Sequence, residues 1–174
     1  MDIVELILND HHEQRRMFAT LDDLHESEAD ALSAVWGRLR VLLEVHAEAE
    51  ERLFYPELLR LGTGAGSKDS PEAETDDAIH DHNEIRDAIG LVDAEEVGTG
   101  SWWKAVAKVR EANSDHMGEE ERESLADFRR HADLDLRHSL GLSFVVFEAQ
   151  HAHGVSAQDI DPSRYIERQG GQAT

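Results

Sequence analysis

The chain contains two short sequence motifs, and each of them occurs twice. The motif Asp-His-x-Glu-x-Arg occupies residues 10–15 and again 81–86, and the motif His-x-x-x-Glu-Glu-Arg occupies 46–52 and again 116–122. The repeated histidines of each copy are similarly spaced, by 35 residues from position 11 to 46 and by 34 residues from position 82 to 116. This repetition predicts a chain made of two similar halves, each folded as a hairpin of two helices.

The positions of glycine and proline predict where the helices begin and end. The 174 residues include 12 glycines and 3 prolines, so long stretches of good helix formers remain uninterrupted. Two such stretches, separated by a polar turn, precede a glycine-rich loop at residues 62–67. Ser70 followed by Pro71 is typical of the start of a third helix, and Ser101 can cap a fourth.

These four helices with short connections predict an all-α fold, an up-down-up-down four-helix bundle at residues 1–127. The helical pattern continues in residues 128–153, where we expect an additional helix packed on the outside of the bundle. The C-terminal tail, residues 154–174, is polar. We expect this tail to be loosely ordered apart from an anchor at Tyr165 and Ile166.

Composition excludes several classes of function. The chain has no cysteine, which excludes disulfides, thiolate nucleophiles, iron–sulfur clusters and cysteine-type zinc sites, so a metal would be bound by imidazole and oxygen. Its 17 basic and 38 acidic residues give a net charge of −21, which repels nucleic acids and anionic membrane surfaces. No apolar run approaches the roughly 20 residues that cross a bilayer, and no signal peptide is evident. We therefore expect a cytoplasmic protein without nucleic-acid or membrane partners.

The four repeated histidines are predicted to lie at one level of the bundle. His11 and His46 lie about 25 Å on either side of the first turn, at 1.5 Å per helical residue, and His82 and His116 lie on either side of the loop near residue 99. Each occupies a position on the apolar face of its helix. The four imidazoles should therefore converge on the bundle axis.

Two glutamates are predicted to join them. Glu50 and Glu120 each follow a repeated histidine by four residues, which places both side chains on the same side of the helix. Glu119 has a possible ligand spacing too, but its counterpart in the other copy is Ala49. The repeat similarly argues against His12 and His80, whose counterparts are asparagines. We interpret all histidines outside the repeated four as surface residues or as groups behind the ligands: His12, His25, His80, His131, His138, His151 and His153.

Metal binding explains this arrangement better than ordinary packing does. A single histidine on an apolar stripe is usually a core residue with satisfied hydrogen bonds, but here four recur at one level with paired glutamates. Burying such groups without a partner costs several kcal/mol for each charged group. Six ligands in two layers suit two ions better than one, and a nitrogen and oxygen ligand set with two carboxylates favours iron or manganese over zinc, copper or nickel. We therefore favour two iron ions.

The order of these residues resembles a known family. A histidine, then His-x-x-x-Glu, then a histidine, then His-x-x-x-Glu on four successive helices is the pattern of hemerythrin-like proteins, which carry the HHE cation-binding domain. The resemblance covers residues 2 to about 125, and the C-terminal extension is similar to one found in some actinobacterial members. It implies the following metal ligands: His11, His46, Glu50, His82, His116 and Glu120. It further implies two iron ions joined by an oxo or hydroxo bridge, with zinc or manganese as less favoured alternatives.

The resemblance also implies a class of function. Hemerythrins that carry oxygen have five histidines with an aspartate and a glutamate bridge, whereas here Arg86 follows His82 by four residues, which argues against simple oxygen transport. A nitrogen-rich ligand set favours binding or sensing of O2, NO or peroxide over substrate oxidation. A catalase-like or peroxide-reducing enzyme, and an iron-storage or structural metal-binding bundle, are the alternatives. The expected partner is a small diatomic or peroxide ligand, and the pattern leaves the oligomeric state open.

Two aspartates are expected near the centre, and the position of one tyrosine is left open. Asp10 and Asp81 precede repeated histidines and should accept hydrogen bonds from ligand imidazoles of neighbouring helices. Tyr55 lies nine residues after His46, about 180° round an ideal helix, so periodicity argues against a contact with the centre. A kink at Pro56, or the role that a tyrosine has in the family, leaves that contact open.

Overall fold

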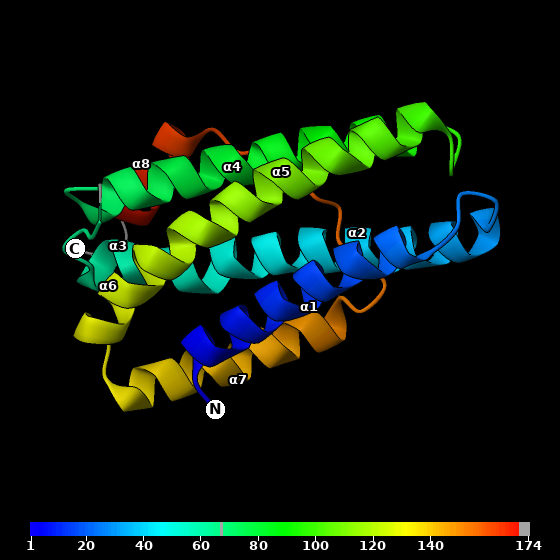
Figure 1. Cartoon of the computed structure of the whole chain (residues 1–174). Coiled ribbons are helices and arrows are strands. Elements are labelled where there is room, and N and C mark those ends of the chain that lie inside the picture. The colour runs from blue at the N-terminus through cyan, green and yellow to red at the C-terminus, as the bar shows by residue number, and fades with distance from the viewer. Residues whose placement is uncertain (67, 171–174) are drawn as a thin grey trace.

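Helices account for almost all of the structure. The computed structural model describes residues 1–66 and 68–170, and this part of the chain contains no strand. Its elements are α1 (Ile3–Asp23), α2 (Ala29–Ala49), the π-helix η1 (Glu50–Phe54), α3 (Tyr55–Leu61), α4 (Pro71–Asp93), α5 (Gly100–Arg122), α6 (Ser124–His131), α7 (Leu134–Gln150) and α8 (Pro162–Gly170) (Figure 1). Within the described ranges, no helix is both long and apolar enough to cross a membrane. Residue 67 of the expected loop and residues 171–174 of the expected tail lie outside these ranges.

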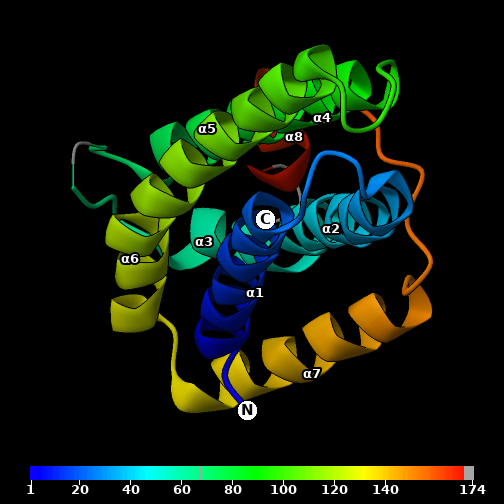
Figure 2. The ribbon, with the colours of Figure 1, turned by 45° about the vertical axis from the view of Figure 1, so that its right-hand side comes forward.

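The helices α1, α2, α4 and α5 form the predicted bundle. Successive helices run in opposite directions, and α2, η1 and α3 follow one another without a loop (Figure 1). The helix α7 packs along α1, and the short α8 packs on α4 and α3 (Figure 2). The predicted all-α fold, an up-down-up-down four-helix bundle with an additional C-terminal helix, is therefore confirmed.

Side-chain caps fix the helix starts. Asp2 accepts a hydrogen bond from the backbone N–H of Val4 at 3.0 Å, and Ser70 accepts one from Ala73 at 3.2 Å, with Pro71 at the first helical position. The predicted cap of the fourth helix at Ser101 is wrong. Thr99 caps that helix instead, since its hydroxyl accepts from the N–H of Trp102 at 3.2 Å and its own backbone is extended. Two hydroxyl residues this close along the chain compete for one role, and the backbone conformation decides between them.

The apolar core is divided into two clusters. One cluster contains Trp36, Trp102 and their neighbours at the end of the bundle where α1 joins α2. The other contains Phe54, Phe128 and Phe144 at the end where α3 and α6 lie. Along α1 and α2, His11 and His46 stand between the residues of the two clusters. A layer of buried polar side chains therefore interrupts the core at the predicted level.

The C-terminal extension covers the bundle on two sides. Phe144 of α7 is fully buried, and its ring centroid lies 6.1 Å from that of His46. On the other side, the hydroxyl of Tyr165 in α8 donates to the backbone carbonyl of Glu51 at 2.5 Å. The expected anchor at Tyr165 is thus in place, but the loose order expected for the surrounding tail is wrong over residues 162–170. A helix this short is marginal in isolation, so tertiary contacts such as that of Tyr165 hold it in place.

Candidate metal centre

The structure brings the six predicted residues together. His11 comes from α1, His46 from α2, Glu50 from η1 and His82 from α4, and α5 supplies both His116 and Glu120. All six are at most 4% exposed. Their ligand-type atoms form two groups within which all atoms lie within 4.8 Å of one another: His11, His46, Glu50 and Glu120 in the first, and Glu50, His82 and His116 in the second. The two groups share Glu50, and either could hold a metal ion.

The inward atoms of these residues are the ones that bind metals. Nε2 of His46 lies 3.0 Å from Oε1 of Glu50, and Nε2 of His82 lies 3.4 Å from Oε2 of the same carboxylate. Nε2 of His11 lies 3.3 Å from Oε2 of Glu120. Glu50 therefore presents one oxygen to each group, as a bridging carboxylate does.

Several of the inward atoms are buried without a hydrogen-bond partner. They are Nε2 of His11 and of His46, both carboxylate oxygens of Glu50, and Oε2 of Glu120. In addition, the Nε2 atoms of His82 and His116 face each other at 3.1 Å, so two ring lone pairs oppose each other unless a proton or a cation lies between them. Buried polar groups are rarely left unsatisfied, so this donor set fits cations at its centre.

The outward nitrogen of each imidazole faces a carboxylate on another helical segment. The four Nδ1 contacts are His46 to Asp10 at 2.9 Å, His116 to Asp81 at 3.4 Å, His82 to Glu51 at 2.9 Å, and His11 to Glu121 at 3.0 Å. An acceptor at Nδ1 keeps the proton there and leaves the lone pair of Nε2 directed inward, which is the arrangement of metal-bound histidines. Asp10 and Asp81 thus lie where the sequence predicted them.

Sequence reasoning missed the other two carboxylates and the arginines behind them. Arg86 donates to Oε1 of Glu51 at 2.6 Å, and Arg15 donates to Oε1 of Glu121 at 2.8 Å. Burial would raise the pKa of Glu51, but the hydrogen bond and charge of His82, together with those of Arg86, hold that pKa below its usual value. The signal was present in the repeat, because the second glutamate and the arginine recur in both copies. Each half therefore lends a glutamate to a histidine of the other half.

Tyr55 also reaches the centre. Its fully buried hydroxyl donates to Oε1 of Glu120 at 2.8 Å, and burial together with nearby carboxylates raises its pKa well above the usual value. The periodicity that argued against this contact fails because η1 is a π-helix, in which the N–H of Tyr55 bonds to the carbonyl of Glu50 five residues earlier. The extra residue turns the side chain by about 100° relative to an unbroken α-helix. Pro56, which cannot donate to the carbonyl of Arg52 and crowds it, accounts for the break in the α-helical pattern.

The carboxylates make the centre attractive to positive charge. Burial lowers the pKa of His82, but the carboxylates of Glu50 and Glu51, which lie beside its two ring nitrogens, outweigh burial and raise it to about 9. Burial likewise disfavours charge on His46, and Glu50 and Asp10 raise its pKa well above the usual value despite this. The centre thus favours bound cations, which can be protons or metal ions.

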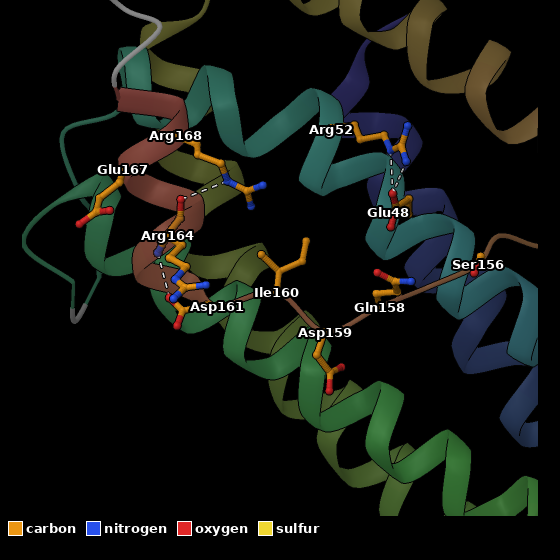
Figure 3. Close-up of a pocket in the computed structure, with 10 residues that line it drawn as sticks. All are labelled: Glu48, Arg52, Ser156, Gln158, Asp159, Ile160, Asp161, Arg164, Glu167 and Arg168. Atoms are coloured by element: carbon orange, nitrogen blue, oxygen red, sulfur yellow. Dashed lines mark hydrogen bonds and ion pairs between the residues drawn. The ribbon is translucent and has the colours of Figure 1, made fainter.

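Other features of the chain lie apart from this centre. None of the other seven histidines belongs to either group of ligand-type atoms in the described residues. A surface pocket of about 1020 Å³ lies between α8 and the end of α2, and none of the six residues lines it (Figure 3). Its Arg52 is paired with Glu48 at 2.6 Å, as the dashed lines in Figure 3 show. The predicted chemistry is therefore confined to the interior of the bundle.

A comparison with known proteins shows the family to which the chain belongs. A family model described as the hemerythrin HHE cation-binding domain matches residues 2–126, which is more than two thirds of the chain. No curated protein and no solved structure matches the chain. The matched segment contains all six residues of the centre and ends within α6, before the additional helix α7 begins. The chain belongs to the hemerythrin family of HHE cation-binding domains.

Proposed function

We propose that the protein is a non-haem di-iron protein that binds or senses O2, NO or peroxide. The observation that carries this proposal is the set of buried, unpartnered Nε2 and carboxylate oxygen atoms directed at one another, each imidazole being held from behind by a carboxylate. His11, His46 and Glu120 would hold one ion, His82 and His116 the other, and Glu50 would serve both.

The ligand chemistry favours iron. The centre offers no sulfur, and four imidazoles with two carboxylates suit a borderline ion that accepts both nitrogen and oxygen. Iron would supply reversible redox chemistry and coordination positions open to a small ligand. The chain supplies the rest: carboxylates that fix the imidazoles, a hydrogen bond from Tyr55 that holds one oxygen of Glu120, and burial that excludes bulk water.

Metal quantification with an absorption spectrum tests the proposal. We expect two iron ions per chain and the near-ultraviolet absorption of an oxo-bridged ferric pair. The variant His82→Ala should lose metal because it removes a ligand from the second group, whereas His12→Ala should keep the metal because that side chain is outside both groups. Zinc in place of iron, or equal metal in both variants, would contradict the proposal.

One observation favours the second candidate function, a catalase-like or peroxide-reducing activity. Tyr55 places a phenolic proton at the centre, 2.8 Å from Glu120, where it could be donated during turnover. Such an enzyme would convert two molecules of hydrogen peroxide into one of O2 and two of water. Rapid oxygen evolution that is abolished in His82→Ala and strongly reduced in Tyr55→Phe would support it, and no oxygen evolution above that of free iron would exclude it.

A further inference from the structure

Two amide side chains are buried in the core beside the centre. Gln14 of α1 is fully buried and Asn113 of α5 is 3% exposed. The Nδ2 of Asn113 donates to Oε1 of Gln14 at 3.0 Å, so the pair joins the two helices. Amide groups are uncommon in an otherwise apolar core and need their hydrogen bonds satisfied.

The pair lies on the side of the centre opposite to the two glutamates. Gln14 follows His11 by three residues in α1, and Asn113 precedes His116 by three residues in the antiparallel α5. Both amides are therefore displaced from the histidines by about 4.5 Å toward the end where α1 joins α2. Glu120 follows His116 and is displaced toward the other end. Along the helices, the carboxylates thus lie on one side of the four histidines, and the amides lie on the other.

One donor of this pair has no partner. The Nε2 of Gln14 is buried and makes no hydrogen bond, although the Oε1 of the same amide is occupied by Asn113. Leaving a buried donor unpaired costs free energy that an apolar side chain of similar size would not cost. The unpaired N–H group therefore calls for an acceptor that is not part of the chain.

The repeat shows that the fold does not require these amides. Gln14 of the first half is matched by Ile85 of the second, and Asn113 of the second half is matched by Leu43 of the first. The side chains of Ile85 and Leu43 are both buried and apolar. Each helical hairpin thus carries one amide and one hydrocarbon side chain at this level. The two amides meet between α1 and α5, so they distinguish the side of the centre near His11.

We propose that Nε2 of Gln14 donates a hydrogen bond to a small exogenous ligand bound at the metal centre, and that Asn113 is a positioning residue that holds the amide in this orientation. This inference rests on the proposed di-iron function. It specifies the ligand class: a small anion or partly negative molecule with an acceptor atom, of which azide and peroxide are examples. The surrounding side chains on this side are apolar, so the amide supplies the polar contact that selects such a ligand.

Azide binding to the iron-loaded full chain tests the inference. Gln14→Met removes the donor and keeps a side chain of similar length, and Ile85→Met places the same residue at the equivalent position in the other half. We expect the azide dissociation constant, measured by absorption titration, to rise about 10- to 100-fold in Gln14→Met, as for loss of a hydrogen bond to a charged group. Ile85→Met should bind azide as the unaltered protein does. The infrared band of bound azide should shift in D2O in the unaltered protein, and this shift should shrink in Gln14→Met.

The outcomes separate this inference from the proposed function. Iron content is measured first, and an unaltered protein that takes up no iron overturns both. If the unaltered protein and Gln14→Met load two irons and bind azide equally well, only the role of Gln14 is overturned. An azide band that does not move in D2O in the unaltered protein overturns it as well, and this measurement needs no variant to fold. Equal weakening in Gln14→Met and Ile85→Met would show a packing effect and would also overturn it.

Discussion

The two halves of the bundle are alike in the carboxylates that support the four imidazoles from behind and differ in the helices beyond them. In both halves an aspartate supports the histidine of its own hairpin, and a glutamate held by an arginine supports a histidine of the other hairpin. Beyond these contacts, the first half continues from Glu50 into a π-helix, whereas in the second half α5 ends at Arg122 and a new helix begins. The contacts that both halves share are those that orient the four imidazoles, and the differences give each side of the centre its own environment.

The coverings differ as well. The helix α7 packs on α1 and α2 and places Phe144 against His46. The helix α8 packs on α4, and its Tyr165 donates a hydrogen bond to η1. At the same level, one half presents the amide of Gln14 and the other the hydrocarbon of Ile85. Under the proposed function, the two ions would therefore have different surroundings, and a ligand would meet a different environment on each side of the centre.

The largest expected effect is loss of both ions when the shared carboxylate is removed. Glu50 belongs to both groups of ligand-type atoms, whereas Glu120 belongs to one. We therefore expect Glu50→Ala to retain less than one iron per chain and Glu120→Ala to retain the ion held by His82 and His116. Iron analysis after desalting measures this difference. Equal iron loss in the two variants would show that the halves do not share Glu50 in the way the geometry indicates.

Removal of the metal should have the next largest effect, on stability. Metal-binding free energy that is not available to the unfolded chain adds directly to the free energy of unfolding. Each ion present at 100 times its dissociation constant adds about 2.7 kcal/mol. Chelation should therefore lower Tm by more than about 5 °C, as measured by circular dichroism in the presence and absence of added iron. An unchanged Tm after verified removal of the metal would mean that the polar layer is stable on its own.

The metal-free protein should also become less stable as the pH rises. The carboxylates of Glu50 and Glu51 raise the pKa of His82 to about 9 in the folded protein despite its burial, whereas its usual value is 6.5. A group with a raised folded pKa contributes stability that is fully present below pH 6.5 and is lost as the pH passes through about 9. We expect a loss of up to about 3 kcal/mol over this range, measured by urea unfolding, and little of it in His82→Gln.

Glu51 and Glu121, the glutamates that face the outward nitrogens of His82 and His11, provide a matched test of the two halves. Glu51 is almost fully buried with Arg86, whereas the side chain of Glu121 is 29% exposed beside Arg15. Loss of such a partner typically weakens metal binding 10- to 100-fold, which is roughly the range we expect for these variants. Glu51→Gln should lie at the upper end, because it leaves a buried guanidinium without its charged partner, and Glu121→Gln should lie at the lower end. Competition with a chelator of known affinity measures the metal affinity of both variants. A larger loss of affinity in Glu121→Gln than in Glu51→Gln would contradict the expected order.

The repeat made most residues of the centre predictable from the sequence. The contact that the sequence left open depends on local backbone geometry that the sequence pattern does not reveal. Histidines that recur at core positions must converge once four helices form, so His11 and His82 could be placed without any tertiary information. The contact of Tyr55 could not, because a single π-turn changes the face on which every later residue lies. The helix α8 was missed for a different reason: a nine-residue helix is marginal on its own, and contacts made across the fold, such as the one from Tyr165 to Glu51, stabilise it.

The smallest effect is expected at the hydrogen bond that joins α8 to η1 of the first half. Tyr165→Phe removes the hydrogen bond to the carbonyl of Glu51, which should cost about 1 kcal/mol of stability. Because that carbonyl belongs to η1, and Glu51 supports His82, a modest increase in the rate of metal release should accompany the loss of stability. Ser163→Ala, at an exposed position of the same helix, is the matched control and should change neither quantity. If Tyr165→Phe lowers stability but leaves metal release unchanged, α8 supports the fold alone, and the covering of this half has no part in holding the ions.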